Sequence, residues 1–210
     1  MTAPVKLYRN PKSGHCHRVE LMMLFLDIPY ETIDLDMANG AHKAPDYLKI
    51  SPLGQVPAID DNGVTLSDSN GIITYLVETY AKDYNWTGRT PEEKAQVQRW
   101  LSVAAGEIAY GPCAARLVTV FGSPLDHAGA VAKAHALFKV IDAALDGTRF
   151  LVSDRITLAD VASYSYIAHA PEGGVSLEAY PNIRAWLSQI EAQQNFVAMA
   201  TSPIPDPVQA

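Results

Sequence analysis

The sequence SGHC at positions 13–16 combines side chains that could do chemistry. It follows an apolar run, VKLY at positions 5–8, and precedes a helical pattern, so it lies at the start of a predicted helix. Backbone N–H groups and the helix dipole favour an anion at such a position, and a thiolate there has a lowered pKa. Three interpretations are open: a redox motif without its first cysteine, a site that uses a hydroxyl, and a helix cap.

The type and position of each side chain indicate which of these interpretations it fits. Ser13 can donate a hydrogen bond to a thiolate, and it can equally be a plain N-cap. Cys16 lies one turn into the helix, where packing as a buried small residue is favoured over reactivity. His15 and His17 do not have the spacing of a convincing metal site with only Cys16 nearby, so they are predicted to be solvated.

A second segment, Gln55-Val56-Pro57, begins a predicted strand. A proline at this position lacks a ladder donor and can follow a cis peptide bond. The backbone of Val56 could then pair with an extended peptide by strand addition. An ordinary edge-strand proline is the equally open alternative.

A third segment, SDSN at positions 67–70, begins another predicted helix. Its free N–H groups and the Ser69 hydroxyl could hold a carboxylate, and Asp68 could accept from an ammonium. A redundant helix cap is the commoner role of such a cluster, and capping is compatible with binding. Together the three segments fit a ligand with a thiol, a peptide backbone and a zwitterionic head group, and glutathione has all three.

The predicted elements place these segments in an α/β arrangement of order β-α-β-α-β-β-α, followed by helices alone. Strand patterns occur at 5–8 and 30–35, helical patterns at 19–26, 45–50 and 67–80, and a hairpin with an Asn-Gly turn at 57–66. Residues 83–90 have no clear period and are predicted to be a linker. From residue 91 the pattern is helical, with helix starts at 90–93 and 157–160. We therefore expect an N-terminal domain at 1–82 and an all-α domain at 91–210.

The composition excludes several classes of protein. The chain has 210 residues, 19% of them charged, and a net charge of −7, so nucleic-acid binding is disfavoured. Two cysteines far apart in sequence indicate a reducing compartment rather than a disulfide framework. No secretory signal is visible at the start, and the richest apolar run is too short to span a bilayer. A cytoplasmic location without membrane association is expected.

The sequence resembles the cytosolic glutathione S-transferases, in a bacterial-type form with a serine-type first-helix motif. LYRNPKSGHCHRVEL, YLKISPLGQVPAIDDNGVTLSDSNGIITYL and RITLADVASY carry the resemblance, which covers nearly the whole chain. It implies a thioredoxin-like N-terminal domain, a helical C-terminal domain and a homodimer. It also implies glutathione as co-substrate and no metal.

The resemblance also assigns roles to residues. Ser13 falls where serine-type members carry the residue that holds the glutathione sulfur, with Tyr8 as the rival hydroxyl. The glutathione site is implied to consist of Lys43 at the glycyl carboxylate, Gln55, the backbone of Val56, a cis Pro57, and Asp68 with Ser69 at the γ-glutamyl end.

The acceptor site is expected in the helical half, in the segment GEIAYGPCAARLVTVF. Tyr110 and Arg116 are predicted to line it because both have polar ends. Phe121 is a weaker candidate, for which core packing is favoured. Gly111-Pro112 should bend this helix.

The function implied is conjugation of the glutathione thiolate to small, largely apolar electrophiles. Glutathione-dependent disulfide reduction or peroxide removal is an alternative that uses the same site. A non-catalytic partner-binding protein on the same fold is a second alternative, because a fold alone does not assign activity.

Overall fold

The structure, a computed structural model, describes residues 3–81 and 85–206. The chain forms two compact units: Met1–Tyr84 with Gln194–Ala200, and Asn85–Gln193 with Thr201–Ala210. Residues 194–200 thus belong with the N-terminal unit, which no local sequence pattern indicates. Residues 83 and 84 of the predicted linker lie outside the described residues.

The N-terminal unit is built on a four-stranded mixed sheet with strand order β2-β1-β3-β4. Strand β1 is parallel to β2 and antiparallel to β3, and β3 is antiparallel to β4. The strands are β1 (Val5–Arg9), β2 (Tyr30–Asp34), β3 (Ala58–Asp61) and β4 (Val64–Ser67). A parallel pair needs a crossover connection, which helix α1 (Gly14–Phe25) provides.

The turn between β3 and β4 shows why this hairpin can be recognised from sequence. Asn62 and Gly63 have φ angles of 51° and 92°. Two-residue hairpin loops require this left-handed conformation, which Asn-Gly adopts readily. The predicted hairpin is confirmed.

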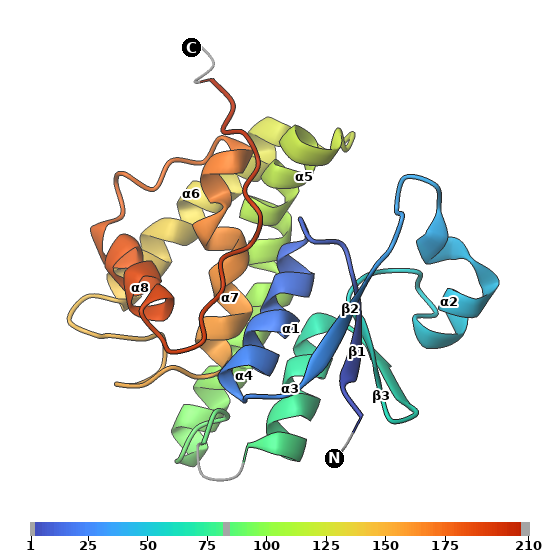
Figure 1. Cartoon of the computed structure of the whole chain (residues 1–210). Coiled ribbons are helices and arrows are strands. Elements are labelled where there is room, and N and C mark those ends of the chain that lie inside the picture. Colours follow the sequence, from blue (N-terminus) through green and yellow to red (C-terminus); the bar gives the residue numbers. More distant parts are fainter. Residues whose placement is uncertain (1–2, 82–84, 207–210) are drawn as a thin grey trace. The chain divides into compact units, whose positions relative to one another are not determined.

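Helices cover both faces of the sheet. Helices α1 and α3 (Ser69–Tyr80) lie on one face, and the short η1 (Ala41–Lys43) and α2 (Pro45–Ile50) lie beyond the other (Figure 1). The apolar face of α1, including Val19, Met22 and Met23, is fully buried. Burial of each such side chain contributes about 1.5–3 kcal/mol. The predicted element order and the thioredoxin-like class are confirmed.

The second unit is all-helical, as predicted. Its elements are α4 (Pro91–Ala105), a π-helical turn η2 (Ala109–Cys113), α5 (Ala114–Phe121), α6 (His127–Ala144), α7 (Leu158–Ala168), η3 (Ala170–Gly173) and α8 (Pro181–Glu191). Helix α7 is buried from Leu158 to Ile167 and forms the centre of this unit. Gly111 and Pro112, where a bend was expected, lie in the π-helical turn η2.

A capping box fixes the start of α7. The Asp160 carboxylate accepts hydrogen bonds from the Thr157 backbone N–H at 2.8 Å and from Trp186 Nε1 at 2.9 Å. Burial raises the pKa of Asp160 although these hydrogen bonds favour the ionised form. The predicted capping box is therefore present. None of the described helices is long and apolar enough to cross a bilayer.

Candidate active site

Three predicted site segments meet at one end of the sheet. Ala58, at the start of β3, pairs with Tyr8 near the end of β1 and with Ser67 at the end of β4. The residues after β1, before β3 and after β4 therefore leave the sheet at the same edge. The first leads into α1 and the last into α3, so two helix N-termini lie on one side of this edge (Figure 1). Their dipoles make the region favourable for anions.

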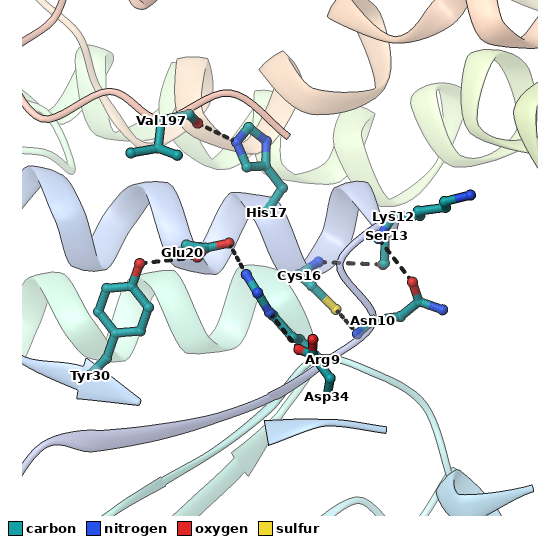
Figure 2. Close-up of polar contacts among 10 residues, drawn as sticks. All are labelled: Arg9, Asn10, Lys12, Ser13, Cys16, His17, Glu20, Tyr30, Asp34 and Val197. Atoms are coloured by element: carbon teal, nitrogen blue, oxygen red, sulfur yellow. Dashed lines mark hydrogen bonds and ion pairs between the residues drawn. The ribbon is translucent and has the colours of Figure 1, made fainter. Parts of the chain in front are cut away.

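Ser13 is the N-cap of α1. Its Oγ accepts a hydrogen bond from the backbone N–H of Cys16 at 3.4 Å, and the side chain is half-buried (Figure 2). A hydroxyl that accepts one bond still has its own proton to donate. Capping and the stabilisation of a thiolate are therefore compatible at Ser13.

Cys16 faces the interior. It is 1% exposed, and its Sγ accepts from the Asn10 backbone N–H at 3.5 Å (Figure 2). Burial raises the pKa of the Cys16 thiol to about 11, although hydrogen bonds from Ser13 and Asn10 partly oppose it. A thiol of this kind is not a nucleophile at neutral pH, which agrees with its interpretation as a packing residue.

Asp68 is the N-cap of α3. Its carboxylate accepts from the Gly71 backbone N–H at 2.8 Å, and its φ of 77° is left-handed. This backbone conformation is uncommon for a residue other than glycine. The side chain remains exposed, so a carboxylate oxygen can still accept from an ammonium.

Ser69, the first residue of α3, is held by two side chains of α1. Its Oγ lies 2.8 Å from Arg18 Nη1 and 3.2 Å from His15 Nδ1. Arg18 Nη1 also donates to Asn70 Oδ1 at 2.7 Å. These bonds join the two helix starts, and local sequence reasoning missed them. The spacing of His15 and Arg18, three residues apart and so on one helix face, was the available signal.

The loop before β3 is fixed through its backbone. The carbonyl oxygen of Gln55 accepts from Tyr47 Oη at 2.7 Å and from Ser51 Oγ at 2.9 Å. The side chain of Gln55 is exposed, and the peptide bond between Val56 and Pro57 is cis. The loop therefore has a defined shape and an exposed polar side chain.

Lys43 reaches the same loop. Its Nζ donates to the Leu53 carbonyl at 3.0 Å. Gly54 has a φ of +59°, and a Cβ there would lie 2.7 Å from Lys43 Nζ. Gly54 leaves room for the Lys43 side chain, which therefore lies against the loop that precedes Gln55.

Tyr8 has a different neighbourhood. Its ring packs against that of Tyr47 from α2, with ring centres 5.8 Å apart. The role of Tyr8 as the alternative hydroxyl to Ser13 stays a prediction. Tyr8 lies on strand β1 rather than at a helix N-terminus.

Glu20 and His17 fix α1 to its neighbours. Arg9 of β1 donates to Glu20 at 2.6 Å and to Asp34 of β2 at 2.8 Å (Figure 2). His17 Nε2 donates to the Val197 carbonyl at 2.8 Å (Figure 2). The prediction that His17 is solvated is wrong, because the imidazole is 3% exposed and is covered by residues 194–200.

His15 is half-buried rather than fully solvated. Burial, and then the Arg18 charge, lower the pKa of His15 to about 3. The imidazole is therefore neutral at ordinary pH. The sequence prediction failed because the partner of His15 on α3 is 54 residues away.

The acceptor-site candidates have two environments in the second unit. Tyr110 lies in the π-helical turn η2 and is 66% exposed. Arg116 is 1% exposed, and its Nε donates to Glu172 at 2.6 Å. Its guanidinium also lies 5.8 Å from the Phe121 ring, which is 44% exposed rather than in the core. Tyr110 is thus exposed, whereas the guanidinium of Arg116 is held in a buried ion pair.

Glu172 is the centre of that buried cluster. Burial opposes its ionisation, but hydrogen bonds from His169, the Ser202 backbone N–H and Arg116 hold the pKa of Glu172 below its usual value. Within residues 3–81 and 85–206, no group of three or more potential metal ligands is found.

Comparison with known proteins identifies the family of the chain. The sequence model described as "Glutathione S-transferase, N-terminal domain" matches residues 13–79, and "Glutathione S-transferase, C-terminal domain" matches residues 126–194. A solved glutathione S-transferase from Pseudomonas fluorescens has a TM-score of 0.87 and 25% identity, over 94% of this chain and 99% of that one. Glutathione transferase F2 from Populus trichocarpa has a TM-score of 0.80 and 30% identity, over 91% of this chain and 95% of that one.

A curated relative extends the match to the full length. The chain is 31% identical to glutathione S-transferase 3 of Zea mays, over 98% of this chain and 97% of the relative. Because this identity covers both units, the chain belongs to the glutathione S-transferase family.

Proposed function

We propose that this glutathione S-transferase conjugates glutathione to small, largely apolar electrophiles, with Ser13 as the residue that holds the reacting sulfur. The observation that carries the proposal is the pair of helix N-termini at one sheet edge, one of them capped by a half-buried serine. A ligand thiolate and a ligand carboxylate can be stabilised there at the same time.

The reaction follows from this electrostatic arrangement. The N-terminus of α1 and the Ser13 hydroxyl favour the thiolate over the thiol, so the thiol of bound glutathione loses its proton more easily than in water. The sulfur then donates an electron pair to the electrophilic carbon, a C–S bond forms, and the leaving group departs with its electron pair. No protein atom becomes covalently bound.

The glutathione-binding residues are proposed from the same edge. Asp68 accepts from the γ-glutamyl ammonium and Ser69 donates to its carboxylate. The backbone of Val56 pairs with the cysteinyl part of glutathione. Gln55 and Lys43 complete the site, the latter at the glycyl carboxylate.

The acceptor site is proposed to include Tyr110, whose exposed phenol could contact an electrophile or its leaving group. Arg116 is not carried into this proposal, because Glu172 already holds its guanidinium inside the second unit.

The alternative functions are separated by one set of measurements. Turnover on an aryl halide is compared with turnover on a glutathione mixed disulfide and on a hydroperoxide, while glutathione thiolate is followed by ultraviolet absorption. Dominant aryl halide turnover is expected, since Cys16 is buried and cannot form the dithiol exchange pair. Dominant disulfide turnover would favour thiol exchange, and no retention on immobilised glutathione would favour a non-catalytic protein.

A homodimer is also proposed. Leu53, in the loop between α2 and β3, is a large apolar side chain that is 74% exposed, so it is accessible to a second subunit and is the position chosen for the test. Light scattering should give twice the chain mass, and Leu53→Ser should shift the equilibrium toward monomer. A cytoplasmic location is proposed from the two unbridged cysteines, Cys16 and Cys113.

A further inference from the structure

The Ser69 hydroxyl is held from two sides by α1. Arg18 Nη1 lies 2.8 Å from Ser69 Oγ, and His15 Nδ1 lies 3.2 Å from the same atom. Arg18 is 1% exposed and Ser69 4%, so both are shielded from bulk water. The proton positions around Ser69 are therefore set by protein groups.

Hydrogen-bonding capacity limits the arrangements of these protons. A serine hydroxyl has one proton to donate and two lone pairs that accept. Arg18 can only donate, so it occupies one lone pair of Ser69. His15 is either a donor at Nδ1, which occupies the second lone pair, or an acceptor, which takes the Ser69 proton.

The two tautomers of His15 give Ser69 opposite properties. With a proton on Nδ1, His15 and Arg18 both donate to Ser69, and the serine proton is free to point toward a ligand. With Nδ1 unprotonated, the serine proton points to His15, and only a lone pair remains for a ligand. A carboxylate accepts and cannot donate, so it is bound only by the first arrangement.

We propose that His15 is a positioning residue for the γ-glutamyl carboxylate of glutathione: as the Nδ1–H tautomer it donates to Ser69 and directs the serine proton at that carboxylate. The proposal rests on the proposed function, in which Ser69 binds this carboxylate. His15 itself does not touch glutathione or the reacting sulfur.

Neutrality of the imidazole supports this role. Burial, followed by the charge of Arg18, lowers the pKa of His15 to about 3. The imidazole is therefore neutral through the usual assay range, with a proton on one ring nitrogen and not on the other. The expected effect lies on ground-state binding, because the carboxylate is remote from the bond that forms.

The first test compares His15→Leu with His15→Asn. Leucine removes the donor, whereas the asparagine amide can place an N–H close to the position of Nδ1. His15→Leu should raise KM for glutathione about five-fold, as expected for one neutral hydrogen bond, with kcat within about two-fold of wild type. His15→Asn should keep KM within about two-fold of wild type.

Two glutathione analogues show which ligand group is affected. γ-Aminobutyryl-cysteinyl-glycine lacks the γ-glutamyl carboxylate, and its KM should be the same for wild type and His15→Leu. Glutaryl-cysteinyl-glycine keeps the carboxylate but lacks the ammonium, and its KM should rise as for glutathione. Equal KM values of wild type and His15→Leu for glutathione would overturn the proposal, as would equal losses in the leucine and asparagine variants or a rise with the decarboxylated analogue.

A second test uses the unmodified protein, so it holds even if His15→Leu does not fold. The ¹⁵N chemical shifts of the His15 ring distinguish Nδ1–H from Nε2–H. Nδ1–H with glutathione bound is expected, and Nε2–H would overturn the proposal. If the wild-type protein does not bind glutathione at all, the proposed function is overturned, and this inference with it. That outcome is measured on the wild-type protein alone, so it is distinguished from a failure of the inference.

Discussion

The N-termini of α1 and α3 lie at the same sheet edge but hold their serine side chains differently. Ser13 of α1 accepts one long bond, 3.4 Å, from the backbone N–H of Cys16. Asp68 of α3 accepts a short cap bond of 2.8 Å from Gly71, and the neighbouring Ser69 accepts from Arg18 at 2.8 Å. One helix start is loosely capped, and the other is firmly held.

Because of this difference, we expect one helix start to contribute mainly to ligand binding and the other mainly to the reaction. A firmly held hydroxyl suits recognition, because the ligand loses little energy in ordering it. A hydroxyl with a long bond suits stabilisation of a charge that develops during the reaction, because it can reorient toward that charge. We therefore expect changes at Ser13 to act mainly on the reaction and changes at Ser69 mainly on binding.

The largest effect is expected for Ser13→Ala. A hydrogen bond to a charged group is worth about 1.5–3 kcal/mol, so the pKa of the bound glutathione thiol should rise by about one to two units. The kcat near pH 6.5 should fall about 10- to 100-fold, with KM for glutathione little changed. Thiolate absorption and kcat should both recover at higher pH.

Ser13→Thr is the matched control, because it keeps a hydroxyl at the cap. It should retain most of the activity that alanine loses. If the alanine variant forms the thiolate as readily as wild type, Ser13 is not the stabilising group, and Tyr8→Phe becomes the variant to measure.

A smaller effect, on the binding of glutathione rather than on the reaction, is expected for Ser69→Ala. Removing the donor to the γ-glutamyl carboxylate should raise KM for glutathione about ten-fold, with kcat within about two-fold of wild type. Steady-state kinetics with varied glutathione measure both constants. A fall in kcat comparable to that of Ser13→Ala, with KM unchanged, would remove the distinction between the two helix starts.

The sequence predicted the contacts at the start of α1 better than those at the start of α3. Ser13 is bonded to a residue three positions away, and Asp68 likewise, so caps can be recognised locally. The bonds from Arg18 and His15 to Ser69 span 51 and 54 residues. Such pairs depend on how α1 and α3 pack on the sheet, which a single sequence does not specify.

The same reason explains the other missed features. His17 bonds to Val197 across 180 residues, and Arg116 pairs with Glu172 across 56. Each is a polar side chain whose burial follows from a distant segment. Element order, by contrast, depends on local periodicity and caps, and it was predicted from residue 5 to residue 80.

The stability of the protein in acid should reveal the environment of His15, which contacts Ser69 at the start of α3, without any ligand. The pKa of His15 is about 3 in the folded protein and about 6.5 in the unfolded chain. Between these values the unfolded chain binds more protons, so the free energy of unfolding falls as pH decreases, by up to about 1.4 kcal/mol per pH unit. The contribution is constant above about pH 6.5.

Urea unfolding at a series of pH values from 7 to 4 measures this slope. His15→Leu has no titrating side chain there, so its stability should fall less steeply with acid than that of the wild type. His17→Leu is a useful comparison because it changes a histidine on the same helix that faces residues 194–200. Parallel curves for wild type and His15→Leu would mean that His15 is not held neutral beside Ser69 and Arg18.

The smallest effect on activity is expected for Cys16→Ala, at the loosely capped helix start. With a pKa of about 11, about one Cys16 side chain in ten thousand is a thiolate at neutral pH. The sulfur packs in the interior, so its loss should cost about 1 kcal/mol of stability and leave kcat within about two-fold of wild type. Conjugation kinetics and thermal unfolding of the same preparation measure both quantities. A folded Cys16→Ala variant without activity would assign the chemistry to the protein thiol. Full activity would leave the Ser13 hydroxyl and the N–H groups of α1 as the means by which this helix start acts on a sulfur that belongs to the ligand.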